Sequence, residues 1–134
     1  MIGVVVVAHF GIAKEIIDAA TRIMDREIAG LTGVSIDYTE DSESISNKLK
    51  QALKEVDKGD GVLIFTDMFG GTPSNVGLTF HEKDKVEVIS GLNLPMLLKA
   101  VSQREGKGLS ELANATRSAG RESIQMASDL LSGR

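Results

Sequence analysis

The sequence predicts an α/β fold: a doubly wound, mainly parallel open sheet with helices on both faces. Apolar runs typical of buried strands alternate along the 134 residues with segments whose apolar residues recur at helical spacing. No low-complexity linker, internal repeat or change of composition interrupts this alternation, and the length suits a single hydrophobic core. We therefore expect residues 1–134 to form one domain.

The first half of the chain contains two strands and two helices in alternation. Residues 2–8 are an unbroken apolar run, which suits a parallel strand buried on both faces, and residues 12–24 carry one apolar helical stripe. Residues 34–38 alternate apolar and polar side chains, so we expect a strand with one apolar face at an edge of the sheet. A second amphipathic helix is predicted over residues 45–56, with Asp41 or Ser42 before it as the N-cap.

The second half continues the alternation. Residues 62–65 form an uninterrupted apolar run that predicts a central strand, and Thr72 with Pro73 fits the N-cap and first position of a helix. Later segments are a fourth strand at residues 86–89, a helix with Pro95 near its start, a polar loop at residues 104–108, and a final helix from residue 109 that Gly120 is placed to end.

The residues after Gly120 fit two kinds of secondary structure. Ile124 and Met126 alternate with other residues as in a strand, whereas Ile124, Leu130 and Leu131 also fall on one face of a helix. The pattern alone leaves both interpretations open.

Composition argues against several classes of function. The 15 basic and 19 acidic residues give a formal net charge of −4, which opposes binding to nucleic acid or to an anionic membrane. The longest apolar stretch is about eight residues, far short of the ~20 that a membrane-spanning helix needs, so we expect a cytoplasmic protein with no direct membrane insertion. With no cysteine and two histidines, we expect no metal site, and the motifs indicate no cofactor.

One histidine stands at the edge of the sheet where ligands bind in open α/β folds. His9 directly follows the first predicted strand and precedes the first predicted helix. An imidazole there can carry out phosphoryl or proton chemistry, although His9 alone could equally satisfy a local backbone group. The other histidine, His81, lies among charged residues and is expected to be a solvated surface residue.

The loop after the third strand carries a second group of candidate residues. Asp67 follows that strand, and Gly70 and Gly71 come directly before the predicted helix start at Thr72. Glycines allow close approach of the backbone to an anion, and the free amides of a helix start stabilise negative charge. A tight turn without any ligand would require the same glycines. Direct nucleotide binding has little support, because no P-loop or dinucleotide-binding motif is present.

Together the two loops predict a phosphohistidine site. If the first and third strands are adjacent in a parallel sheet, His9 and Asp67 lie side by side at one edge. The Asp67 carboxylate would accept a hydrogen bond from one ring nitrogen, fix the tautomer and leave the other nitrogen as a nucleophile. The backbone amides of Gly70, Gly71 and Thr72, with the Thr72 hydroxyl, would then bind the charged phosphoryl oxygens.

These residues resemble a known family, the IIA domains of the mannose-type sugar phosphotransferase systems. The resemblance covers nearly the whole chain, and its matching segments are the strand ending in His9, residues 67–75, residues 91–97 and residues 120–122. It implies a phosphotransferase that accepts a phosphoryl group on His9 from the histidine-containing phosphocarrier protein and passes it to a separate IIB component, for sugar uptake or regulation. By the same match, Asp67 orients His9 and Thr72 contacts the phosphoryl group.

The chain departs from the family pattern directly after the histidine, where the family usually has glycine and this sequence has Phe10. We expect Phe10, Phe69 and Asn75 at the rim of the site, where partner proteins would make contact. The resemblance also favours an antiparallel strand over residues 122–128 that is exchanged between the subunits of a homodimer.

Three other functions remain open from the sequence. A phosphoryl relay subunit of a dihydroxyacetone kinase system would use the same histidine with a different acceptor. A non-catalytic flavodoxin-like module would bind a nucleotide or flavin in the same crevice. A hydrolase using Thr72 or Ser74 with His9 and Asp67 has little support, because the chain lacks a Gly-x-Ser-x-Gly nucleophile elbow.

Overall fold

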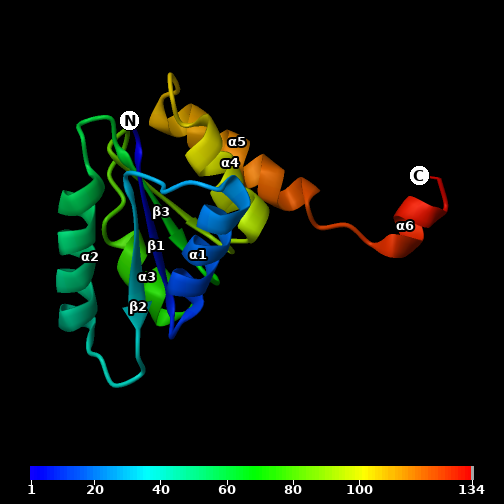
Figure 1. The fold of residues 1–134 in the computed structure, drawn as a ribbon. Coiled ribbons are helices and arrows are strands. Elements are labelled where there is room, and N and C mark those ends of the chain that lie inside the picture. Colours follow the sequence, from blue (N-terminus) through cyan, green and yellow to red (C-terminus); the bar gives the residue numbers. More distant parts are fainter. Residues whose placement is uncertain (134) are drawn as a thin grey trace.

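The computed structural model describes residues 1–133 and is built around a four-stranded sheet in the order β2-β1-β3-β4 (Figure 1). The strands are β1 (Gly3–His9), β2 (Leu31–Ile36), β3 (Val62–Thr66) and β4 (Val86–Ser90). The helices are α1 (Ile12–Met24), α2 (Ser42–Val56), α3 (Thr72–Leu78), α4 (Leu94–Gln103), α5 (Leu109–Glu122) and α6 (Ala127–Leu131). All three strand pairs are parallel, which confirms the predicted fold class and the edge position of β2.

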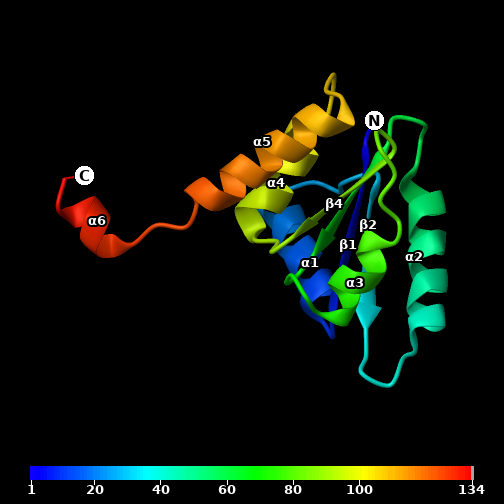
Figure 2. The ribbon, with the colours of Figure 1, turned by 180° about the vertical axis from the view of Figure 1, so that it is seen from behind.

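β1 lies inside the sheet because both of its faces are apolar. Val4 and Val6 face one hydrophobic cluster, Val5 and Val7 face the other, and all four are fully buried. Helices α1, α4 and α5 cover the first face, and α2 and α3 cover the second (Figures 1 and 2). Each buried valine contributes about 1.5–3 kcal/mol, so this double coverage holds the strand that carries His9 firmly in place.

Helix starts follow the predicted capping chemistry with one shift. Asp41 caps α2 by accepting a hydrogen bond from the Ser44 backbone N–H at 2.8 Å. The N-cap of α3 is Gly71, so this helix begins at Thr72, one residue earlier than predicted. None of the helices within residues 1–133 is long and apolar enough to cross a lipid bilayer.

Gly120 does not end the last long helix, contrary to the prediction, because α5 continues to Glu122. A Cβ atom at Gly120 would lie 2.4 Å from Met96 Cγ, and the Gly120 carbonyl accepts a hydrogen bond from Asn93 Nδ2 at 3.1 Å. Glycine is therefore needed at this position because α5 crosses the start of α4 at close range.

Residues 104–108 form a loop, as the polar pattern predicts, but the side chain of Arg104 is buried. The residue is 5% exposed, and its Nη1 donates to the carbonyls of Ile2 at 3.2 Å and Gly30 at 3.1 Å. Its Nη2 donates to the carbonyl of Ala29, and burial lowers the pKa of the guanidinium from its usual value. Arg104 thus joins the chain segments that enter β1 and β2.

We expect Arg104→Met to lower the free energy of unfolding by about 2–4 kcal/mol, because three carbonyls lose a charged donor. Urea denaturation measures this loss. Arg22→Met, at an exposed position on α1, is the matched control and should change the free energy by less than about 0.5 kcal/mol. An equally small change for Arg104→Met would show that the buried guanidinium contributes nothing net.

The tail beyond α5 differs from the strand predicted over residues 122–128. Glu122 belongs to α5, Ala127 begins α6, and in the described part of the chain the residues between them pair with no strand. Helix α6 stands away from the body of the molecule (Figure 1), and Leu131 in this helix and Ile124 before it are 87% and 78% exposed. The helical interpretation is right for Ala127–Leu131, because helix hydrogen bonds form within one chain whereas a strand needs a partner.

Candidate active site

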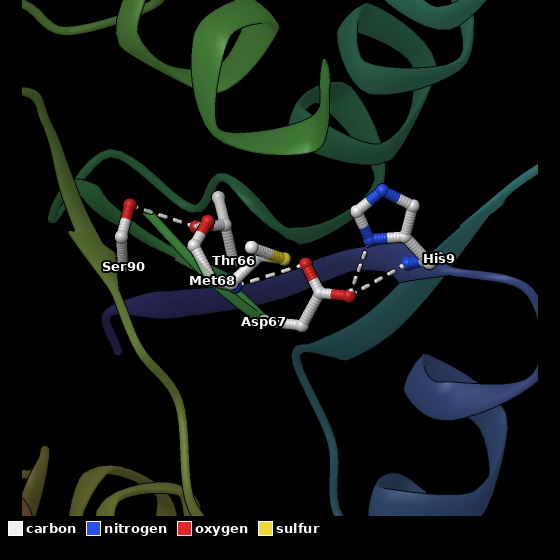
Figure 3. A network of polar contacts seen from close by, with 5 residues as sticks. All are labelled: His9, Thr66, Asp67, Met68 and Ser90. Atoms are coloured by element: carbon white, nitrogen blue, oxygen red, sulfur yellow. Dashed lines mark hydrogen bonds and ion pairs between the residues drawn. The ribbon is translucent and has the colours of Figure 1, made fainter. Parts of the chain in front are cut away.

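His9 and Asp67 meet at the carboxyl edge of the sheet. Strands β1 and β3 are adjacent and parallel, with Val7 opposite Thr66, so the residues that follow in each strand come close together. The Asp67 Oδ2 atom accepts a hydrogen bond from the His9 backbone N–H at 3.0 Å and lies 2.7 Å from the ring Nδ1 (Figure 3). The structure brings together the two residues that the sequence had singled out.

The surroundings of Asp67 favour its ionised form. Burial by itself raises the pKa of the carboxyl group, whose side chain is 12% exposed. Hydrogen bonds from the His9 backbone and ring, and from the Met68 N–H at 3.0 Å, outweigh burial and hold the pKa of Asp67 below its usual value. An ionised Asp67 has acceptor oxygens only, so it favours the His9 tautomer that carries its proton on Nδ1, in which Nε2 has a free lone pair.

The second ring nitrogen of His9 points away from Asp67 (Figure 3). The His9 side chain is 32% exposed, so the ring is partly open to solvent at the edge of the sheet. Gly71 lies next to the same side of the ring, where a Cβ atom would be 3.0 Å from His9 Cε1 and 3.5 Å from Nε2. A side chain at position 71 would therefore crowd the nucleophilic nitrogen.

The other predicted phosphoryl-binding residues lie in the same turn. Gly70 has a φ of +91°, a conformation that L side chains rarely adopt, and it turns the chain between Asp67 and Gly71. Thr72 and Asn75 are exposed, and the first turn of α3 closes with a hydrogen bond from the Asn75 N–H to the Gly71 carbonyl at 2.9 Å.

Aromatic side chains lie at the rim of the site. Phe10 is 50% exposed and packs edge to face against Tyr38 with ring centroids 5.0 Å apart, and Phe69 is 76% exposed. Phe10 has a φ of 49°, in the left-handed region that glycine adopts without strain and other residues adopt at a cost of about 1–2 kcal/mol. This conformation gives a physical reason for the glycine that is usual after the histidine in the family that the sequence resembles.

Three hydroxyl groups behind the site were not predicted as a network. Thr66 Oγ1 donates to Ser90 Oγ at 2.8 Å, and Ser74 Oγ lies 3.1 Å from the same Ser90 atom. Ser74 is fully buried, so it is not an accessible nucleophile, which argues against Ser74 as the nucleophile of the hydrolase alternative. The only sequence signal for this network is the placement of hydroxyl residues at the ends of two strands and in the first turn of a helix.

Comparisons with known proteins place the chain in a family. The family described as "PTS system fructose IIA component" matches residues 3–117. The fructose-specific EIIA component of the phosphotransferase system (PTS) of Bacillus subtilis is 31% identical over 132 residues, which cover 98% of this chain and 90% of that protein. The mannose-specific EIIAB component of Escherichia coli is 29% identical over 129 residues, covering 92% of this chain and 39% of that longer protein.

Solved structures agree with the sequence comparisons. A phosphotransferase system EIIA component from Streptococcus agalactiae has a TM-score of 0.85 and 26% identity, with 96% of this chain and 99% of that chain covered. A mannose/sorbose-specific IIA subunit from Enterococcus faecalis has a TM-score of 0.83 and 25% identity, with 93% of each chain covered. The protein therefore belongs to the EIIA-man family of phosphotransferase system IIA components.

Proposed function

We propose that this protein is a phosphocarrier. It accepts a phosphoryl group on His9 from the phosphorylated histidine-containing phosphocarrier protein and passes it to a separate IIB component, for sugar uptake or regulation. The observation that carries this proposal is the 2.7 Å contact between Asp67 Oδ2 and His9 Nδ1, with the second ring nitrogen directed away from Asp67 (Figure 3). This arrangement favours the tautomer with the proton on Nδ1, in which the nucleophilic lone pair is on Nε2.

In the proposed reaction, His9 Nε2 attacks the phosphorus atom of the donor's phosphohistidine. A new N–P bond forms as the donor's N–P bond breaks, and the donor imidazole leaves with the bonding electron pair. The His9 ring retains its Nδ1 proton and becomes positively charged, and the Asp67 carboxylate stabilises this charge at 2.7 Å. Transfer to the IIB component repeats the same step with His9 as the leaving group.

We assign the transferred phosphoryl group to the turn at Gly70, Gly71 and Thr72. Its oxygens would accept hydrogen bonds from these backbone amides and from the Thr72 hydroxyl. This assignment is supported by the close approach of Gly71 to the ring, where the missing Cβ leaves room beside Nε2. The exposed side chains of Phe10, Phe69 and Asn75 are the proposed contacts for the donor and acceptor proteins.

Phosphoryl transfer in two stages tests the proposal. Incubation with phosphoenolpyruvate, enzyme I and the phosphocarrier protein should add one phosphoryl group that is labile in acid and stable in base. Adding a IIB component should then remove it, and a dihydroxyacetone kinase system in its place tests the alternative acceptor. Thermal stabilisation by a nucleotide or flavin, without any phosphoryl uptake, would contradict the carrier function and favour a binding module.

We also propose a cytoplasmic homodimer in which the tail of one subunit pairs with the other. Within residues 1–133, β4 forms the sheet edge opposite β2. Val86 at this edge already pairs with Glu82, and the Val88 N–H donates to Glu87 Oε1, so a further strand would pair with the end of β4 near Ser90. A groove of about 370 Å³ runs beside this edge and includes Phe69, Leu78 and Ile89. The tail supplies exposed apolar side chains, Ile124 and Met126, that suit such a groove.

Replacing both Ile124 and Met126 by serine should convert the dimer to a monomer, because the exchanged segment loses the side chains that would be buried. Sedimentation equilibrium of the full-length chain and the variant measures this change. Ile23→Ser is the matched control, since Ile23 is an exposed apolar residue on α1, and it should leave the dimer intact. A wild-type chain that is monomeric at micromolar concentrations would refute the exchange.

A further inference from the structure

The Ser90 hydroxyl forms hydrogen bonds at both ends of the loop that carries Asp67 and Gly71. Thr66, the last residue of β3, donates through Oγ1 to Ser90 Oγ at 2.8 Å (Figure 3). Ser74, in the first turn of α3, places its Oγ 3.1 Å from the same atom. The two partners are fully buried, so water does not replace a lost hydrogen bond there without a rearrangement.

Two residues of this loop lie against the His9 ring, one on each of two sides. Asp67, next to Thr66, contacts Nδ1 at 2.7 Å, and Gly71, three residues before Ser74, approaches Cε1 so closely that a Cβ would lie 3.0 Å away. A shift of the Ser74 end relative to the Thr66 end therefore alters the position of Asp67 or Gly71 against the ring. Misplacement of a reacting group by about 1 Å can cost a hundredfold in rate.

The two ends of the loop are not equally dependent on the hydroxyl of Ser90. The Thr66 carbonyl also accepts hydrogen bonds from the backbone N–H groups of Gly91 at 3.1 Å and Leu92 at 3.0 Å. The hydrogen bond of the Ser74 side chain within residues 1–133 is the one to Ser90. Ser90 thus connects the end of the sheet to the first turn of α3 by hydrogen bonds, in addition to the packing of α3 against β1, β3 and β4.

We propose that Ser90 is a positioning residue for phosphoryl transfer. Its hydroxyl, bonded to Thr66 and Ser74, sets the separation of Asp67 and Gly71 on the two sides of the His9 ring without touching the reacting atoms. The effect on transfer rests on the proposed phosphocarrier function, whereas the effect on the orientation of the ring does not.

The kinetic test measures single-turnover phosphoryl uptake over a range of concentrations of the phosphorylated donor. We expect Ser90→Ala to lower the maximal rate by about tenfold, because the reacting groups lose alignment. The half-saturating donor concentration should stay within about twofold, because the docking residues are unchanged. Ser90→Thr keeps a hydroxyl and should restore most of the rate, and Ser102→Ala, which removes an exposed hydroxyl on α4, is the matched control. An unchanged maximal rate in Ser90→Ala overturns the proposal.

A double-mutant comparison tests whether the hydroxyl groups act as one link. Ser74→Ala should reproduce the loss of Ser90→Ala, and the double variant should be no slower than either single variant. Thermal melting of each variant shows that the protein compared is folded. Losses that multiply in the double variant would mean that the two hydroxyls act independently, and the proposal would be wrong.

Nitrogen-15 NMR of the His9 ring gives a readout that does not depend on phosphoryl uptake. The wild-type ring should show one neutral tautomer with the proton on Nδ1, whereas Ser90→Ala should show shifts averaged towards the other tautomer. An unchanged ring spectrum overturns the proposal. If the wild type takes up no phosphoryl group but the ring spectrum of Ser90→Ala changes, the positioning role stands and the phosphocarrier function is wrong.

Discussion

His9→Ala is expected to take up no phosphoryl group from the phosphorylated phosphocarrier protein, a loss of at least a thousandfold, on the order seen when a covalent nucleophile is removed. His9 is the histidine at the carboxyl edge of the sheet, with Nδ1 2.7 Å from a carboxylate oxygen and the other nitrogen free (Figure 3). An alanine leaves no nucleophile at this point, and Thr72 is a poor substitute because no base contacts its hydroxyl in the described structure.

His81→Ala is the matched control for this experiment. His81 is half exposed, lies 3.6 Å from the Glu87 carboxylate through Nε2, and sits on the loop before β4. It should retain wild-type uptake, and circular dichroism should show that both variants are folded. If His9→Ala were labelled as fully as the wild type, the phosphoryl group would have to be on another residue and the proposed mechanism would be abandoned.

The fold and the central pair of the site follow from short-range patterns. The sequence predicts β1 and β3 as buried strands because both are unbroken apolar runs. Such runs are needed where helices cover both faces of a sheet. Once the two strands are adjacent and parallel, His9 and Asp67 follow at the same edge. The contact is predictable because it depends on strand type and order, with no need for side-chain detail.

What the sequence did not predict depends on partners far away in the chain. Arg104 lies in a loop, as predicted, but its guanidinium reaches the carbonyl of Ile2, 102 residues earlier. Gly120 looks like a helix end, but its missing Cβ makes room for Met96. Ser90 and Ser74 are ordinary polar residues until β4 and α3 are packed together. These contacts join residues that are far apart in the sequence, so no local periodicity predicts them.

The C-terminal tail shows a different reason why the sequence does not determine the local structure. Residues 124–131 fit a strand and a helix about equally by pattern, and the choice depends on whether a second chain offers backbone hydrogen bonds. In one chain the helix forms over Ala127–Leu131. A strand can replace it only where an edge such as that of β4 is supplied by another subunit.

Asp67→Asn should slow single-turnover phosphoryl uptake by at least about a hundredfold while the protein stays folded. An asparagine can turn its amide so that it donates to Nδ1, which places the ring proton on Nε2 and blocks the nucleophile. A neutral amide also stabilises the cationic ring of phosphorylated His9 less well than a carboxylate 2.7 Å away. Asp57→Asn, at an exposed residue that bonds the Gly59 N–H, is the matched control and should retain wild-type rates.

The lowered pKa of Asp67 predicts that its contribution to the free energy of unfolding depends on pH. This dependence tests the charge of the carboxylate, because asparagine has nearly the same shape but no charge. Because the folded protein holds this pKa below the ordinary value of 3.8, the ionised carboxylate stabilises the fold at pH values above 3.8. That contribution is lost as the pH falls through the folded-state pKa, since the carboxyl group then becomes protonated. The difference in unfolding free energy between wild type and Asp67→Asn should therefore be largest near neutral pH and shrink in acid, as measured by urea denaturation. A difference that grows in acid would mean that His9 and Met68 do not bind the ionised form of Asp67 preferentially, and the tautomer argument for His9 would lose its basis.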